Sequence, residues 1–511
     1  MNNTFKFFKW SVVVMVIVAF LVIVVWSPPV GARKDKESGR VYQFKKNKGI
    51  TITILPRAEF NKRFASMPGV RKTRDSVLRY AREVYSPAGR ELINEECGEE
   101  AYGKLFLSLA NPDITDATRD EVDTIIDLDT PSLPRRYTSG HFKFYYTDKH
   151  TNPDHNVTLA EIQATATVLN DAWNDFATNF TVPKHYVTGG GCDPQQKMVN
   201  VKVYYLGSSL YGATGSSWNY IKLNSKHVVK DSCKRQTTSV HELFHRVQYS
   251  YGYVSGMANM KWAVEGTASW SQKYRADDVG DWMRRMDQGL DYPDLKLISG
   301  RAYNACHFWV YLGQRTQGEA ETMKKVWSTY KVNGKDMKQA VITTIQDRVP
   351  NCANMDQFVG WWLFANFYKD LSNAKPEFDY EEDEWTRDCG GLGPTYGPLA
   401  QVRRTTNSLN VGSNLTRNGI VTPYGADYWV FNIGNTVTGI EIKCTTTSNN
   451  FGYAVIAIKN NAVESYLRTE AGGEKDYNYT KTVSPGQYSQ VAFIVIGNPD
   501  GGNYSINARG S

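Results

Sequence analysis

The chain has 511 residues, of which 41% are hydrophobic and 13% aromatic. This composition is typical of globular domains and excludes an intrinsically disordered protein, and the length predicts about three domains. The formal net charge of +7 is small and much of it lies in residues 33–75, so it does not indicate nucleic-acid binding.

Residues 1–32 form a predicted targeting segment. Lys6 and Lys9 precede an apolar run over residues 11–26, and Val30-x-Ala32 fits a small-residue cleavage site. We therefore expect export with cleavage, and a secreted or extracytoplasmic location. The alternative is an uncleaved membrane tether through residues 11–26, although the basic residues that follow it would favour keeping that side in the cytoplasm.

Residues 33–135 are polar, basic at first and acidic later, with helices expected around 73–96 and 98–110. Prolines and the dibasic pair Arg135-Arg136 mark a linker at the end of this segment. Its place before the next domain predicts either a propeptide or an accessory helical layer, and the sequence does not choose between the two.

Residues 136–370 are predicted to form an α+β domain. The pattern indicates a strand over 141–146, a helix that begins with the capping box Thr158-x-x-Glu161, and a half-buried strand over 199–205. Residues 211–223 predict a turn and another strand, directly before a helix that contains residues 241–245. The later part is predicted to be helical over 266–287, 302–315, 318–332, 335–347 and 355–370.

The motif His241-Glu242-Leu243-Phe244-His245 reads H-E-x-x-H. On a helix, positions i and i+4 share a face, so both imidazoles can bind one Zn²⁺ ion, which in catalytic sites takes three protein ligands and a water. Glu242 is then placed to take a proton from that water. An alternative is that Ser239-x-x-Glu242 forms a capping box, but this does not explain the two flanking histidines.

A second motif follows, Trp262-Ala263-Val264-Glu265-Gly266-Thr267-Ala268. Together the two motifs resemble the gluzincin zinc metallopeptidases, and they are similar to H-E-L-F-H and W-x-x-E-G-T-A in secreted bacterial putative metalloproteases. The resemblance implies that Zn²⁺ is held by His241, His245 and Glu265, with His227 or His307 next in line should Glu265 not bind it. It also implies a zincin-like fold, with a mixed-sheet upper lobe and a helical lower lobe.

The same resemblance implies further features of the site. Ser269 stands where many related enzymes have an aspartate that orients a histidine, so the residues that hold the ligands must differ here. Family members often stabilise the oxyanion with a tyrosine or histidine, for which Tyr303, and after it His307, are the candidates. The strand before the metal helix would be the edge strand that pairs with the substrate backbone.

None of the seven cysteines forms C-x-x-C, so a cysteine zinc site is not expected. In an exported chain some of them should pair, and Cys192 with Cys233 is the first hypothesis. Cys97 is interpreted as a structural cysteine, with capping of the zinc in a latent enzyme as a minor alternative.

Residues 371–400 read as a linker, and its acidic run over 379–384 is interpreted as solvated, with a calcium site as the minor alternative. Residues 401–511 predict a β-sandwich, because short strand-like runs alternate with turn residues and carry no catalytic group. The predicted strands are 428–433, 439–445, 453–459, 490–496 and 503–507.

These patterns predict an exported zinc-dependent endopeptidase that acts on a protein or peptide substrate, with no nucleic-acid partner. One alternative is a catalytically inactive zincin-fold binding protein, against which the intact Glu242 argues. Another is a zinc hydrolase of a non-peptide amide. The sequence leaves the oligomeric state open.

Overall fold

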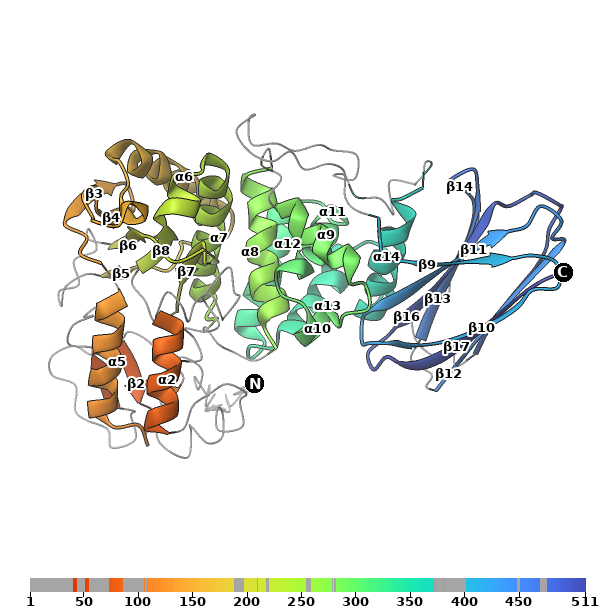
Figure 1. The fold of residues 1–511 in the computed structure, drawn as a ribbon, viewed down its shortest axis with the longest axis horizontal. Coiled ribbons are helices and arrows are strands. Elements are labelled where there is room, and N and C mark those ends of the chain that lie inside the picture. The colour runs from red at the N-terminus through yellow and green to blue at the C-terminus, as the bar shows by residue number, and fades with distance from the viewer. Residues whose placement is uncertain are drawn as a thin grey trace, which may run out of the picture.

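The structure is a computed structural model that describes residues 40–43, 51–54, 73–85, 105–187, 197–253, 259–373 and 380, with short gaps inside these ranges, and then 401–447, 451–468 and 476–511. The described chain is an α+β protein with a C-terminal β-rich region (Figure 1). The targeting segment, Cys97, Cys192 and most of the linker lie outside these residues. Within the described part, no helix is both long and apolar enough to span a bilayer.

The N-terminal part contains an antiparallel pair of strands and two helices. Strands β1 (Arg40–Gln43) and β2 (Thr51–Ile54) pair with each other. Helix α2 (Arg74–Tyr85) begins where a helix was predicted, whereas most of the helix predicted over 98–110 lies outside the described residues. Helix α5 (Asp116–Asp129) was not predicted, because its acidic residues leave only a weak apolar stripe.

The central sheet has the order β3-β4-β6-β8-β7, with β5 pairing to β6. Strands β4, β6 and β8 are parallel, and β3 and β7 lie antiparallel at the two edges. The bounds are β3 Arg135–Ser139, β4 Phe142–Tyr146, β5 Tyr186–Val187, β6 Lys197–Tyr204, β7 Gly212–Thr214 and β8 Tyr220–Asn224. The edge strand was therefore predicted wrongly. The strand just before the helix that carries H-E-x-x-H is β8, which is paired on both sides, and the edge is the short β7.

Helix α6 (Leu159–Asn179) connects the parallel strands β4 and β6, as such pairs require. Its predicted capping box is confirmed, because the Thr158 side chain accepts from Glu161 N while the Glu161 side chain accepts from Thr158 N. Its apolar stripe packs on the next helix, where the Phe176 and Phe244 rings lie 5.3 Å apart. The sheet and α6 thus form a rigid support for the helix that carries H-E-x-x-H.

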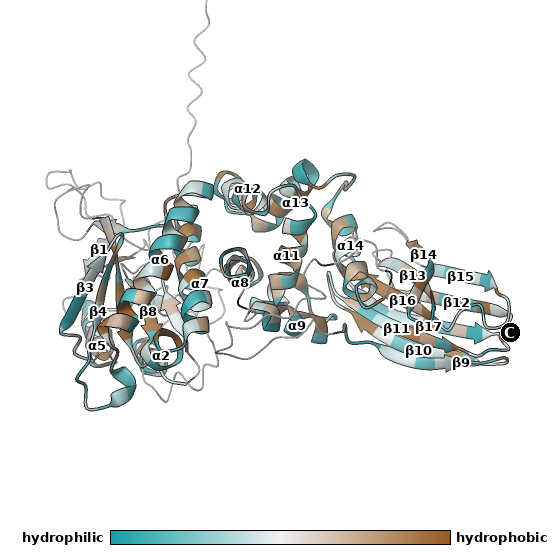
Figure 2. Ribbon diagram, turned by 90° about the horizontal axis from the view of Figure 1, so that it is seen from above, coloured by the Kyte–Doolittle hydropathy of each residue, from teal (hydrophilic) through white to brown (hydrophobic). Residues whose placement is uncertain are grey.

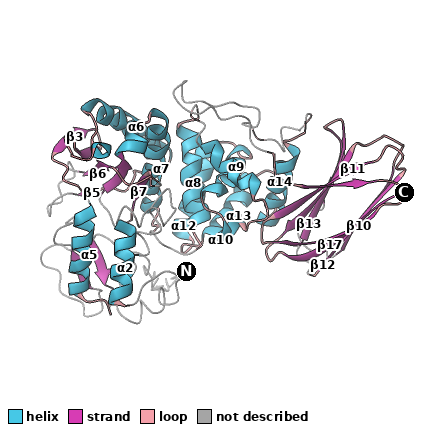
Figure 3. Ribbon diagram, in the orientation of Figure 1, coloured by secondary structure: helices cyan, strands magenta, loops and turns pink. Residues whose placement is uncertain are grey.

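The later part of the predicted α+β domain is helical, and it lies between the central sheet and the C-terminal strands (Figure 3). The helices are α8 Lys261–Arg275, α9 Met283–Asp291, α10 Leu297–Gly300, α11 Cys306–Gln314, α12 Glu319–Val332, α13 Met337–Arg348 and α14 Met355–Tyr368. The single helix predicted over 266–287 is wrong. Ala276 has φ −138° and ψ 50°, so α8 ends there and α9 begins separately.

The C-terminal strands form two sheets, with orders β10-β17-β12-β15 and β14-β13-β16-β11-β9, around a shared hydrophobic core. The bounds are β9 Thr405–Leu409, β10 Asn414–Val421, β11 Ala426–Ile433, β12 Gly439–Thr446, β13 Phe451–Lys459, β14 Ala462–Arg468, β15 Asp476–Thr482, β16 Gln490–Gly497 and β17 Gly502–Gly510. The five predicted strands are present. Strands β9, β10, β14 and β15 were missed because most of their residues are exposed or half-buried and form no clear apolar alternation, as the mixed colours in Figure 2 indicate.

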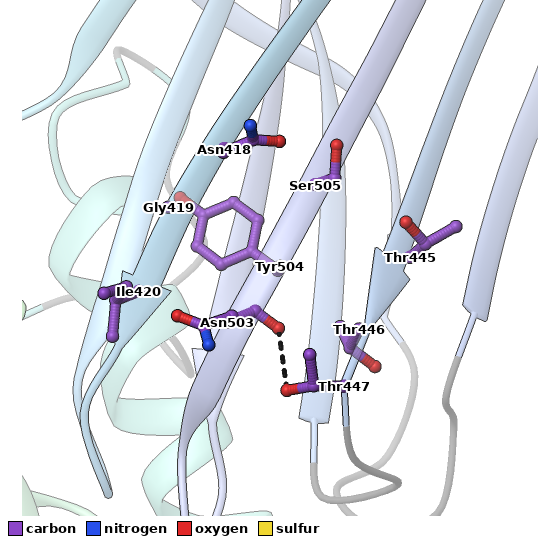
Figure 4. Close-up of a pocket in the computed structure, with 9 residues that line it drawn as sticks. All are labelled: Asn418, Gly419, Ile420, Thr445, Thr446, Thr447, Asn503, Tyr504 and Ser505. Atoms are coloured by element: carbon purple, nitrogen blue, oxygen red, sulfur yellow. Dashed lines mark hydrogen bonds between the residues drawn. The ribbon is translucent and has the colours of Figure 1, made fainter.

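One sheet of this region carries an open pocket of about 560 Å³ (Figure 4). Its lining residues are Asn418, Gly419, Ile420, Thr445, Thr446, Thr447, Asn503, Tyr504 and Ser505. None of them is a carboxylate, histidine or cysteine, so this pocket lacks the usual side-chain ligands of a metal ion.

Candidate metal centre

Helix α7 (Ser232–Ser250) presents the H-E-x-x-H motif. Its N-cap is Asp231, whose side chain accepts hydrogen bonds from the backbone N–H groups of Cys233 and Lys234 at 3.0 Å. Because the N-terminus is capped there, Ser239 and Glu242 lie in the interior of the helix, and the capping-box interpretation of Glu242 is wrong. Cys233 is disulfide-bonded, with its partner outside the described residues, so its pairing with Cys192 stays a prediction.

Three buried side chains from two helices converge on one point. His241 and His245 come from α7 and Glu265 from the neighbouring α8. Glu265 Oε2 lies 3.2 Å from His241 Nε2 and 3.6 Å from His245 Nε2, and one donor atom from each of the three lies within 4.8 Å of the others. The structure therefore places Glu265, the third ligand implied by the resemblance, beside the two histidines.

The spacing of these atoms suits a zinc ion. Zinc takes nitrogen and oxygen ligands at about 2.0–2.1 Å in a tetrahedron, whose edges are then about 3.3 Å long. The two measured N–O separations bracket this value. All three residues are at most 4% exposed, so their donor atoms lie away from bulk solvent.

The electrostatics of the group favour a cation. Burial raises the pKa of the Glu265 carboxyl. The charges of His245 and His241, and the hydrogen bonds that they donate, outweigh burial and hold this pKa below its usual value. Glu265 is therefore a carboxylate that faces two imidazole nitrogens. Without a metal, the two imidazoles are the positive partners of this buried anion, and a bound cation would replace that charge while both rings stay neutral.

Glu242 lies beside the edge strand. A Cβ atom added to Gly212, the first residue of β7, would come within 2.7 Å of Glu242 Cγ and Oε1. Only glycine fits at this position without a shift of the glutamate. Glu242 itself is 1% exposed. The carboxylate proposed as a base thus contacts the strand that lies at the sheet edge.

Tyr303 also lies at the site. It begins a short 3₁₀ turn (Tyr303–Ala305), and its ring stacks on His241 with centroids 5.8 Å apart. The guanidinium of Arg285, on α9, lies 4.8 Å from the centre of the same ring. Arg285 was not predicted to lie here, because residue 285 falls near the end of the single helix predicted over 266–287.

The two alternative histidines lie outside the group of three. His307 is fully buried against Trp362, with Nδ1 at 2.6 Å from the Asn304 carbonyl oxygen, and burial followed by the charge of Arg301 lowers its pKa. His227 lies on a π-helical turn (Ser225–Val229) between the rings of Tyr205 and Tyr211. Neither belongs to a metal-binding cluster of the described residues.

The motif around Glu265 also fixes the position of α8. The Trp309 indole on α11 donates to the Trp262 carbonyl at 2.7 Å, and the two rings stack 5.1 Å apart. A Cβ atom on Gly266 would lie 2.6 Å from the Trp309 ring. The glycine after Glu265 therefore lets Trp309 pack directly against the helix that carries this carboxylate.

We expect Gly266→Ala to destabilise the protein by about 1–3 kcal/mol, because overpacking a filled core forces its neighbours to move. Chemical denaturation measures this change. The matched control is Gly360→Ala on α14, where an added Cβ atom meets nothing within 4 Å. That variant should be unchanged or more stable, since alanine favours helices. Equal stability of the two variants would contradict the proposed packing role.

Comparisons with known proteins add little to this geometry. No protein-family model and no curated protein matches the chain. Similar solved structures include the pre-peptidase C-terminal domain of a collagenase from Bacillus anthracis, with 12% identity, TM-score 0.16, and coverage of 21% of this chain and 97% of that one. A mitogen from Yersinia pseudotuberculosis has 16% identity, TM-score 0.15, and coverage of 19% and 85%. The Aeromonas hydrophila PliG inhibitor of g-type lysozyme has 9% identity, TM-score 0.15, and coverage of 21% of this chain and 100% of that one. At such TM-scores these similarities carry no functional inference.

Proposed function

We propose that the protein is a zinc-dependent endopeptidase of the gluzincin type, with a zincin-like catalytic domain within residues 136–370. The observation that carries this proposal is the buried convergence of His241, His245 and Glu265, in which the Glu265 oxygen lies 3.2 Å and 3.6 Å from the two imidazole nitrogens. The donor set of two imidazoles and one carboxylate is one that catalytic zinc sites use. It leaves a fourth position for water or substrate.

The chain's own residues supply the rest of the chemistry. A zinc ion bound here would polarise the substrate carbonyl and acidify water. Glu242 takes a proton from the water whose oxygen attacks the carbonyl carbon, and it passes that proton to the amine as the C–N bond breaks. The phenol of Tyr303, stacked on His241, is the candidate donor to the developing oxyanion.

A peptide is the favoured substrate because of strand β7. Among the described residues β7 pairs only with β8, and all three of its residues are buried, so an extended chain that paired with its other side would have to displace what covers that edge. Peptides commonly bind by adding a strand to such an edge. Gly212 at the start of β7 contacts Glu242, which would bring a peptide on this edge close to the base.

The remaining parts of the proposal follow from the sequence. Residues 1–32 direct export or tether the chain, residues 33–135 serve as a propeptide or accessory layer, and the C-terminal β-sandwich aids targeting or substrate docking. The alternatives are an inactive binding protein and a hydrolase of a non-peptide amide. The buried placement of Glu242 next to the edge strand favours an active peptidase over both.

We expect the purified protein to contain one zinc ion per chain and to digest casein. A chelator should abolish the digestion, and added zinc should restore it, whereas added magnesium should not, since this donor set suits zinc. Metal content is measured by mass spectrometry and cleavage by release of peptides. Zinc binding without any cleavage would favour the inactive binding protein, and cleavage that resists chelation would disprove the proposed mechanism.

A further inference from the structure

Gln248 connects the two helices that carry the proposed zinc ligands. Its Oε1 lies 2.8 Å from Nδ1 of His245, one helical turn before it on α7. Its Nε2 donates to the Val264 carbonyl oxygen at 2.8 Å and to Thr267 Oγ1 at 3.0 Å, both on α8. Gln248, His245 and Thr267 are fully buried, so water does not compete for these hydrogen bonds.

The orientation of the Gln248 amide is determined by its partners. The Thr267 hydroxyl donates its hydrogen to the Ala263 carbonyl oxygen at 2.7 Å, so towards Gln248 it acts as an acceptor. The Val264 carbonyl is an acceptor as well. The NH₂ group of Gln248 must therefore face α8, and a flipped amide would turn its oxygen towards two acceptors. This leaves the Oε1 acceptor facing His245.

An acceptor at 2.8 Å requires a hydrogen on Nδ1 of His245. In the neutral imidazole the lone pair then lies on Nε2, the nitrogen that faces Glu265. We propose that Gln248 is a positioning residue that holds His245 in the tautomer a metal ion needs, through a chain of hydrogen bonds that begins at Ala263 and passes through Thr267. The inference rests on the proposed metal site.

The same amide positions the third ligand. Val264, which accepts from Gln248, directly precedes Glu265 in the sequence. One side chain thus fixes both the ring orientation of His245 and the backbone next to Glu265. Ser269 stands four residues after Glu265, where the enzymes that the sequence resembles have an orienting aspartate, and Gln248 supplies an orienting contact from a different position.

The first test compares two buried glutamines between the same helices. Gln248→Leu removes the contact with His245, whereas the control Gln272→Leu removes a bond from α8 to the Thr237 carbonyl oxygen without touching a ligand. We expect Gln248→Leu to weaken zinc binding about 10–100-fold, which is the usual effect of losing a residue that orients a ligand. Gln272→Leu should lower only the thermal stability. Competition with a chromophoric chelator measures the affinity.

A second variant separates the two roles of Gln248. In Gln248→Glu the carboxylate still accepts from His245 but cannot donate to Val264. This variant should keep zinc affinity within a few-fold of the wild type while its metal-free form melts at a lower temperature. An affinity as low as that of Gln248→Leu would show that the link to α8, and not the tautomer, matters.

Nitrogen NMR of the histidine rings in the metal-free wild type, at a pH high enough for the His245 ring to be neutral, tests the tautomer directly. We expect the hydrogen of His245 on Nδ1, and its presence on Nε2 instead would overturn the inference even if the variants fail to fold. Wild-type zinc affinity in a folded Gln248→Leu would overturn it too, while leaving the metal site intact. Failure of the wild type to bind zinc would instead contradict the proposed function.

Discussion

Glu242→Gln should reduce proteolysis by about 10⁴-fold, the upper end of what a positioned acid–base group contributes. The amide has nearly the shape of the carboxylate and can still fit beside Gly212, but it cannot take a proton from the attacking water. Glu242 is not one of the three convergent residues, so zinc content should stay near one per chain. Turnover of a casein or peptide substrate and metal analysis of the same sample measure both quantities.

The control for this variant is Glu161→Gln, because Glu161 is the glutamate that does close a capping box. Its loss should change stability by about 1 kcal/mol or less and leave turnover intact. A folded, zinc-loaded Glu242→Gln protein that still cleaves at the wild-type rate would refute the role of Glu242 as the base.

Glu265→Gln should weaken zinc binding by more than about 100-fold, because about 100-fold is the upper end of the effect of residues that only orient a ligand. The substitution removes the single negative charge from a group whose other two members are neutral when they bind a metal. Activity should fall with occupancy, and high zinc concentrations should restore part of it. A zinc titration followed by competition and by turnover tests both expectations.

Glu319→Gln is the matched control. The Glu319 carboxylate contacts α8 through Lys273 at 2.6 Å and the Trp270 indole at 3.2 Å, but it is not part of the metal group. This variant should lose some stability and keep its zinc affinity. If Glu265→Gln retained both metal and turnover, Glu265 would not be a ligand, and the site would have to be built differently.

The sequence predicted helix α7 well because two physical signals coincide in it. The i, i+4 spacing places both histidines on one face, and an apolar stripe through Leu243 and Phe244 places that helix against the core. Glu265 could not be derived in this way, since no periodicity relates residues on two different helices. It was implied only by the resemblance, and the packing of α8 on α7 now places it beside the histidines.

Other features depend on three-dimensional contacts that no local pattern contains. Gln248 is three residues after His245, a spacing at which side chains meet, so a search around the ligands could have found it. Its orientation, however, is set by Thr267 on another helix. Likewise, β7 is too short to give a strand pattern, and its place at the sheet edge emerges only from its pairing with β8.

The junction between α14 and the C-terminal sheets limits where the chain can be truncated and whether the β-rich region can be transferred to another protein. The Tyr428 hydroxyl donates to the Leu363 carbonyl at 2.6 Å, the rings of Phe367 and Tyr428 stack, and one continuous core includes side chains of both parts. A helix as apolar as α14 cannot face water by itself. The β-rich region therefore covers apolar surface of the helical part, and it is not a domain that can be removed without exposing that surface. A chain that stopped at residue 400 would expose this apolar surface to water and would tend to aggregate. Transfer of the β-rich region to another protein would require a helix there with an apolar face that fits the sheet.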